Sequence, residues 1–113
     1  MAYDERLADQ LREFAAGTPG LSETRMFGGL AFLVNGHLAV AASGQGGLLV
    51  RVPPEHAAAL LAEPDTHEFV MPGRRMAGWL RVEPPGVATD EAVERWARIG
   101  LAHAASLPPK ARA

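Results

Sequence analysis

The chain has 113 residues, of which 48% are hydrophobic and 21% are charged, and its formal net charge is −2. These values are typical of one soluble domain with a hydrophobic core, and the weak negative charge disfavours constitutive nucleic-acid binding, which usually comes with a basic domain. Cysteine is absent, which excludes disulfides, thiolate nucleophiles and cysteine-based metal sites and fits a cytoplasmic location.

The first predicted element is a helix over about residues 4–17. Asp4 is a suitable N-cap, and apolar residues follow it at helical spacing. Gly17 and Pro19 end the pattern, because neither residue favours continuation of a helix.

Two to three strands are expected next, over residues 23–27, 30–34 and 37–43. Asn35-Gly36 separates the last two and predicts a tight hairpin, because both central residues of a type I′ turn need positive φ. These strands should therefore pair in antiparallel fashion.

A glycine pair interrupts the first of these strands, where side chains should pack. Such a pair indicates a bulge, a tight bend, or a close approach by another backbone or a ligand. We interpret it as a bend that sets the register of the sheet. The structural motif expected to carry this geometry comprises Met26, Phe27, Gly28, Gly29, Asn35 and Gly36.

A further strand is predicted over residues 48–52, after the glycine-rich turn at 43–47. Pro53-Pro54 stops its ladder, and proline suits the first turn of a helix, so that a short helix follows over 54–62.

The last part of the chain reads as two strands and a helix. Strands are expected over 67–71 and 78–83, with a turn at Pro72-Gly73 between them. Thr89 can cap the final helix, which Pro108 and Pro109 stop. The residues expected on its packed face are Val93, Trp96, Ala97, Gly100, Leu101 and Ala104.

The predicted order is one helix, three to four strands, a helix, two strands and a helix. Runs of antiparallel strands with interleaved helices predict a two-layer α+β fold, with a sheet of about five strands and helices on one face. We expect the first and last helices to cover that face and the second helix to be too short to add much.

Strand alternation predicts which side chains lie on the other, open face of the sheet. They are Arg25, Phe27, Leu33, Ala39, Ala41, Leu49, Arg51, Trp79 and Arg81. A contiguous apolar patch with Trp and Arg is typical of an interface, so we expect another protein partner there, or a homodimer formed through the sheet or its edge. The glycine pair could shift the strand register by one residue, and such a shift would move the side chains of that strand to the opposite face of the sheet.

Several short motifs, taken in order, resemble one protein family. They are Arg25-Met26-Phe27-Gly28-Gly29, Leu30-Ala31-Phe32, Asn35-Gly36, Leu48-Leu49-Val50-Arg51-Val52, Met76-Ala77-Gly78-Trp79-Leu80-Arg81-Val82 and the closing Ala104-Ala105-Ser106-Leu107-Pro108-Pro109-Lys110. Together they resemble the N-terminal domain of the TfoX/Sxy proteins over residues 3–110, with 111–113 as a tail. The resemblance implies an antiparallel sheet with helices on one side, akin to secretion-chaperone-like architecture, and a link to bacterial competence regulation. The named regulators carry a second, helical domain, so we expect a single-domain member.

Catalysis and metal binding have little support in the sequence. His37, His56, His67 and His103 show neither an i, i+4 pairing on a helix nor an H-E-x-x-H motif, and no serine lies in a nucleophile elbow. We expect a non-enzymatic protein with no catalytic residue, metal or cofactor. The sequence also predicts neither a signal peptide nor a membrane span, because no apolar run approaches about 20 residues.

Two other functions stay open at this point. Arg74 and Arg75 follow a predicted turn and can contact a nucleic-acid phosphate or the carboxylates of a partner protein, although a solvated loop is the simpler interpretation. Arg51 and Arg81 strengthen this hypothesis only if they face the same side. The other function is binding of a small molecule in a pocket near Gly28-Gly29 and Trp79.

Overall fold

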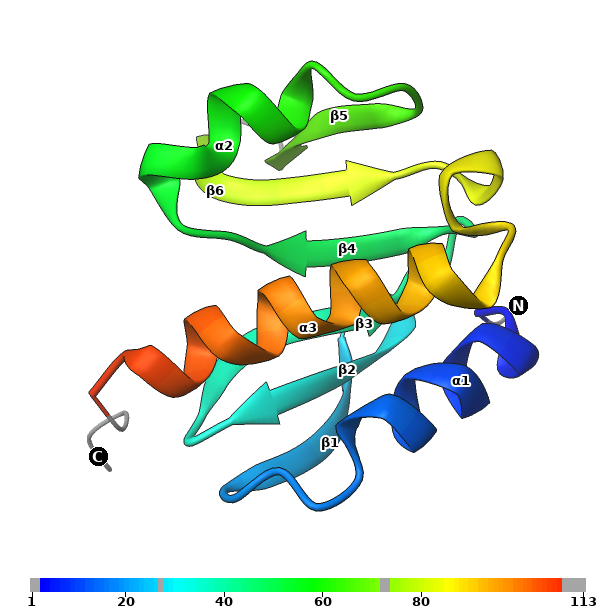
Figure 1. Cartoon of the computed structure of the whole chain (residues 1–113), viewed down its shortest axis with the longest axis vertical. Coiled ribbons are helices and arrows are strands. Elements are labelled where there is room, and N and C mark those ends of the chain that lie inside the picture. Colours follow the sequence, from blue (N-terminus) through cyan, green and yellow to red (C-terminus); the bar gives the residue numbers. More distant parts are fainter. Residues whose placement is uncertain (1–2, 27, 72–73, 109–113) are drawn as a thin grey trace.

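The computed structural model describes residues 3–26, 28–71 and 74–108, without the side chains of residues 70–77, and this part of the chain forms an α+β fold (Figure 1). In chain order the elements are α1 (Glu5–Ala15), β1 (Leu21–Met26), β2 (Gly29–Val34), β3 (His37–Ala42), β4 (Leu48–Arg51), α2 (Pro54–Leu61), β5 (Thr66–Met71), β6 (Arg74–Val82), the 3-10 helix η1 (Pro84–Val87) and α3 (Asp90–Ser106). The predicted class and order are confirmed.

The strands form a single antiparallel sheet in the order β1-β2-β3-β4-β6-β5. The described residues form six strands where about five were expected, and β6 begins earlier than the predicted strand over 78–83. The two long helices, α1 and α3, cross one face of this sheet side by side (Figure 1). None of the helices in the described residues is both long and apolar enough to cross a membrane.

Local sequence signals explain where the long helices begin. The Asp4 carboxylate accepts hydrogen bonds from the backbone N–H groups of Arg6 and Leu7, at 2.9 and 3.3 Å. The Thr89 hydroxyl accepts one from the N–H of Ala92 at 3.1 Å. Each cap satisfies donors that lack a partner inside the first helical turn.

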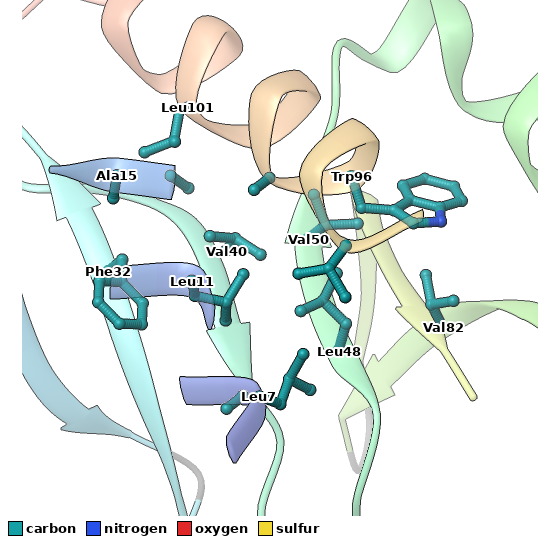
Figure 2. Packing of buried hydrophobic residues seen from close by; sticks show 14 of the residues in the cluster. Leu7, Leu11, Ala15, Phe32, Val40, Leu48, Val50, Val82, Trp96 and Leu101 are labelled. Carbon is teal, nitrogen blue, oxygen red and sulfur yellow. The ribbon is translucent and has the colours of Figure 1, made fainter. Parts of the chain in front are cut away.

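The main hydrophobic core lies between the two long helices and the sheet (Figure 2). Leu11 of α1 lies beside Phe32, whereas the Trp96 ring of α3 extends to the Val82 side of the sheet, away from Phe32. All the residues predicted for the packed face of the last helix are buried. They are Val93, Trp96, Ala97, Gly100, Leu101 and Ala104.

The short helix α2 packs at the β6–β5 end of the sheet. Ala57, Leu60 and Leu61 are partly buried and pack against the same core. The helix contacts β6 and β5, so it extends the helical layer beyond the reach of α3. The sequence predicts that it is too short to add much, and none of its own residues is fully buried.

The β2–β3 hairpin has the expected turn, since Asn35 and Gly36 have φ of 53° and 86°. Its register shifts between Phe32 and Leu33, which leaves Ala39 as an extra residue on β3. Ala39 consequently packs in the helix-side core rather than on the open face. The prediction for Ala39 is wrong because a β-bulge interrupts the strict alternation of side chains.

Arg25 also lies on the other side from the one predicted. It is opposite Leu30 in the β1–β2 ladder, and Leu30 belongs to the helix-side core. Directly opposed residues in an antiparallel pair share a face. Because β1 is an exposed edge strand, a charged residue is tolerated on its helix-side face. The polarity of a side chain in β1 therefore does not indicate which face of the sheet it lies on. Phe27, the other residue expected outward here, lies outside the described residues.

Candidate interaction surface

The face of the sheet opposite the helices carries a second hydrophobic cluster, which we call the open-face cluster. Its buried members are Ala31, Leu38, Ala41 and Leu49. Partly buried side chains surround them and form what we call the rim: Met26, Leu33, Phe69 and Trp79. The hydrophobic residues of the described helices pack on the opposite side, so this apolar surface has no helical cover among them.

The register of the central strands explains the cluster. Ala31 is opposite Ala41, and Ala41 is opposite Leu49, so these three side chains form one row across β2, β3 and β4. The bulge on β3 turns Leu38 to the same face, opposite Leu33. Small alanines beside larger leucines and aromatic residues give a close-packed apolar surface.

An aromatic group occupies the β6–β5 end of this face. The Phe69 and Trp79 rings stack with centroids 6.1 Å apart and an interplanar angle of 23°. Arg51 lies opposite Trp79 in the β4–β6 ladder, and its guanidinium is 5.9 Å from the centroid of the indole ring. This cation–π geometry places a positive charge at the edge of an apolar patch.

Arg81 also lies on this face, but it has a structural role. Its guanidinium donates to the Ser43 hydroxyl at 3.1 Å and to the carbonyl oxygens of Gly46 at 2.8 Å and Gln45 at 3.4 Å. It also pairs with Glu83 at 3.1 Å. The side chain is only 18% exposed, so Arg81 holds the β3–β4 loop against β6 rather than presenting its charge to a partner.

The residues predicted for the interface are thus only partly brought together. Leu33, Ala41, Leu49, Arg51, Trp79 and Arg81 share the open face. Arg25 and Ala39 lie on the helix side. Arg74 and Arg75 lie at the start of β6, opposite Met71 and Val70, and their side chains are not described. Of the four arginines considered for contact with nucleic acid, Arg51 and Arg81 share the open face.

Four residues of this surface were not predicted from the sequence to lie on it: Met26, Ala31, Leu38 and Phe69. Leu38 lies on this face because of the bulge on β3, whereas Phe69 lies there by ordinary alternation, two residues beyond His67, which is opposite Arg81. A bulge has no reliable signature in a single sequence. Met26 would have followed from the correct alternation of β1.

The glycine pair serves a close approach of two backbones. A Cβ on Gly29 would lie 2.1 Å from the carbonyl oxygen of Ala42, and one on Gly44 would lie 2.5 Å from the carbonyl oxygen of Gly28. This confirms one of the expected alternatives, another backbone, and leaves no room for a ligand between these segments. Gly29 also lies beside the Ala42 end of the sheet, whereas Trp79 is at the Arg51 end, so the two do not line one pocket.

Hollows are present elsewhere on the molecule. One of about 280 Å³ lies where the first turns of α1 and α3 meet the β3–β4 loop, lined by residues such as Asp4, Gln10 and Asp90. A shallower groove between α2 and α3 contains His56 and His103. Burial lowers the pKa of His103, and the nearby charge of Arg51 adds to this effect.

The described residues contain no group of three or more His, Cys, Asp or Glu side chains that could hold a metal ion. Two serine hydroxyls, those of Ser43 and Ser106, have structural hydrogen-bond partners. The Ser43 hydroxyl accepts hydrogen bonds from Arg81 and from the N–H of Gln45, and the Ser106 hydroxyl donates to the carbonyl of His103. What the described site offers chemically is apolar and aromatic contact beside one guanidinium.

The sequence model of one protein family, described as the TfoX N-terminal domain, matches residues 10–104. That range begins within α1 and ends in the last turn of α3, so it includes the whole sheet. No curated protein and no solved structure matches the chain.

Proposed function

We propose, from the premise that the chain belongs to the TfoX N-terminal domain family, that it is a regulatory adaptor that binds a partner protein on the open face of its sheet. Membership supports a regulatory or competence-related role at the level of the family. We further propose that the protein is non-enzymatic and acts in the cytoplasm of a bacterium.

The observation that carries this proposal is the partly exposed apolar rim on the face of the sheet that no described helix covers. Leu33, Phe69 and Trp79 are each only partly buried at its rim. Contiguous exposed apolar surface is unfavourable in water and on monomeric proteins usually marks an interaction site. Aromatic residues and Arg are also enriched in the centres of protein–protein interfaces.

The chemistry of this surface also indicates what kind of partner it fits. Leucine, alanine and aromatic side chains favour an apolar segment, and Arg51 over Trp79 favours a carboxylate at one end of that segment. We therefore propose a partner segment with apolar side chains and an adjacent acidic residue.

Replacement of Leu33 by Asp tests the proposal, since it places a charge in the rim without removing a fully buried side chain. In cells that carry the gene, its deletion should change transcript levels of regulated genes, and the wild-type gene should restore them. We expect Leu33→Asp to accumulate as a folded protein and fail to restore those levels.

The matched control is Ala58→Asp, which adds the same charge at an exposed position of α2. This control should restore transcript levels as the wild type does. Full restoration by Leu33→Asp, or a deletion that leaves all transcripts unchanged, would contradict the proposal.

A further inference from the structure

The two edges of the sheet differ in how open they are. β5 has a register shift and contacts α2, and both features hinder the addition of another strand. β1 pairs with β2 without a shift, contains no proline, and has four exposed residues in its middle. An edge strand of this kind presents unpaired backbone groups that can pair with another strand.

One hydrogen bond shows which backbone groups of β1 point away from the sheet. The N–H of Asn35 donates to the carbonyl of Gly20 at 3.0 Å, one step beyond the Leu21–Val34 pair. Gly20 and Asn35 are therefore a hydrogen-bonded pair, and every second residue of β1 after Gly20 also bonds to β2. The residues between them, which include Glu23 and Arg25, direct their N–H and C=O groups outward. Those of Thr24 face β2.

The charges along β1 select a partner strand. In an antiparallel pairing centred on Thr24, Glu23 lies opposite Arg25 of a second copy, and Arg25 lies opposite its Glu23. A two-fold axis relates these contacts, as in most homodimers. Each Glu–Arg pair would exchange two backbone hydrogen bonds, because the outward groups belong to these residues, and Thr24 would meet Thr24 on the open face.

Neighbouring registers are unfavourable. A centre on Glu23 would place two glutamates opposite each other, and a centre on Arg25 would do the same with two arginines; directly opposed like charges destabilise a sheet. A shift by one residue would pair side chains of the helix face with those of the open face. The charges of Glu23 and Arg25 and the need for paired side chains to share a face therefore both favour the pairing centred on Thr24.

Glu23 is held in a suitable position by α1. Its carboxylate accepts two hydrogen bonds from Arg12, from Nε at 2.9 Å and from Nη2 at 3.1 Å. The Arg12 hydrogen bonds lower the pKa of Glu23, so this carboxylate is ionised at neutral pH. An ionised carboxylate has acceptor sites for a second guanidinium, and Arg25 of a second copy would fill them.

We propose that a second copy of this chain pairs with β1 in antiparallel fashion about Thr24, so that two sheets join into one. The pairing uses the edge of the sheet, leaves the open-face cluster free, and does not depend on the proposed function.

Charge reversal tests the pairing on the full-length protein. Sedimentation equilibrium of the wild type should show a dimer at concentrations up to about 0.5 mM. Arg25→Glu opposes Glu23 with a second glutamate, and Glu23→Arg opposes Arg25 with a second arginine, so each variant alone should dimerise at least about tenfold more weakly. A mixture of the two variants restores opposite charges at both pairs and should form a heterodimer.

The control is Arg98→Glu, a reversal of the same size on the exposed face of α3, which should leave dimerisation unchanged. Amide hydrogen exchange gives a second measurement. On raising the protein concentration, the Glu23 and Arg25 amides should gain protection, whereas the Thr24 amide, already bonded to β2, should change little. A monomeric wild type, or single variants that dimerise as the wild type does, would overturn the proposal, as would a mixture that stays monomeric.

Discussion

At the scale of single residues, the backbone of β3 explains two glycines from distant parts of the sequence. A Cβ on Gly29 would lie 2.1 Å from the Ala42 carbonyl oxygen, and a Cβ on Gly100 would lie 2.3 Å from that of Ala39. Both distances are far below van der Waals contact, and the obstacle in each case is a backbone atom. β3 therefore lies close to β2 on one side and to α3 above it because these two side chains are absent.

Gly100→Ala is expected to destabilise the protein although alanine is the better helix former by about 1 kcal/mol. The collision with the β3 carbonyl must be relieved by moving α3 away from the sheet, which typically costs about 1–3 kcal/mol. Urea unfolding measures the change.

The control for Gly100 is the reverse exchange at an exposed position inside the same helix, Ala102→Gly, which should cost about 1 kcal/mol from helix propensity alone. A Gly100→Ala protein that is more stable than the wild type would show that α3 does not approach β3 this closely.

At the scale of elements, an ion pair joins the end of α2 to α3. Arg95 donates from Nη1 to Oε1 of Glu63 at 2.8 Å and from Nη2 to Oε2 at 2.5 Å. Arg95 also lies over the Trp96 ring, 5.1 Å from its centroid. The Glu63–Arg95 ion pair therefore links α3 to the segment that follows α2, the helix that packs against β6.

The hydrogen bonds from Arg95 lower the pKa of Glu63 below its ordinary value of 4.5, and burial opposes them. A lowered folded-state pKa means that the pair stabilises the protein fully above the unfolded-state pKa and loses this contribution as pH falls through the folded-state pKa. We expect Glu63→Gln to reduce the free energy of unfolding at neutral pH by less than about 1 kcal/mol, because both side chains are substantially exposed.

The difference between wild type and Glu63→Gln should shrink as pH is lowered below about 4.5, which thermal unfolding at a series of pH values would show. A difference that grows toward acid pH would contradict the sign of this effect.

At the scale of the whole molecule, one sheet separates two hydrophobic clusters that have different neighbours. The helix-side core includes Leu48, which is fully buried, whereas Leu33 lies at the rim of the open-face cluster and is only partly buried. One cluster stabilises the fold, and the other is the surface on which we propose that a partner binds.

Leu48→Ala and Leu33→Ala distinguish these roles with the same change of side chain. The cavity left by Leu48→Ala should cost about 2–5 kcal/mol of unfolding free energy, measured in urea. Leu33→Ala should cost less than half as much, because its side chain is already in contact with water. Equal losses would mean that Leu33 belongs to the stabilising core.

Much of the architecture could be predicted from local patterns along the chain. Asp4 and Thr89 cap helices as expected, and Asn35-Gly36 forms the expected hairpin. The alternation in β4 and β6 correctly placed Leu49, Arg51, Trp79 and Arg81 on one face. It failed for Ala39, beyond a bulge, and for Arg25, on an edge strand whose exposed side chains do not distinguish the two faces.

The sequence by itself determined the helices, most of the strands and the two-layer plan, because caps, turns and periodicity act within a few neighbouring residues. Only the tertiary structure decided which side chains meet on the open face and which edge is open, since both depend on register between strands. It also showed that Arg81 hydrogen-bonds to the β3–β4 loop and that the glycine pair allows the backbone of β3 to approach closely. These are contacts between residues distant in sequence, and no local pattern records them.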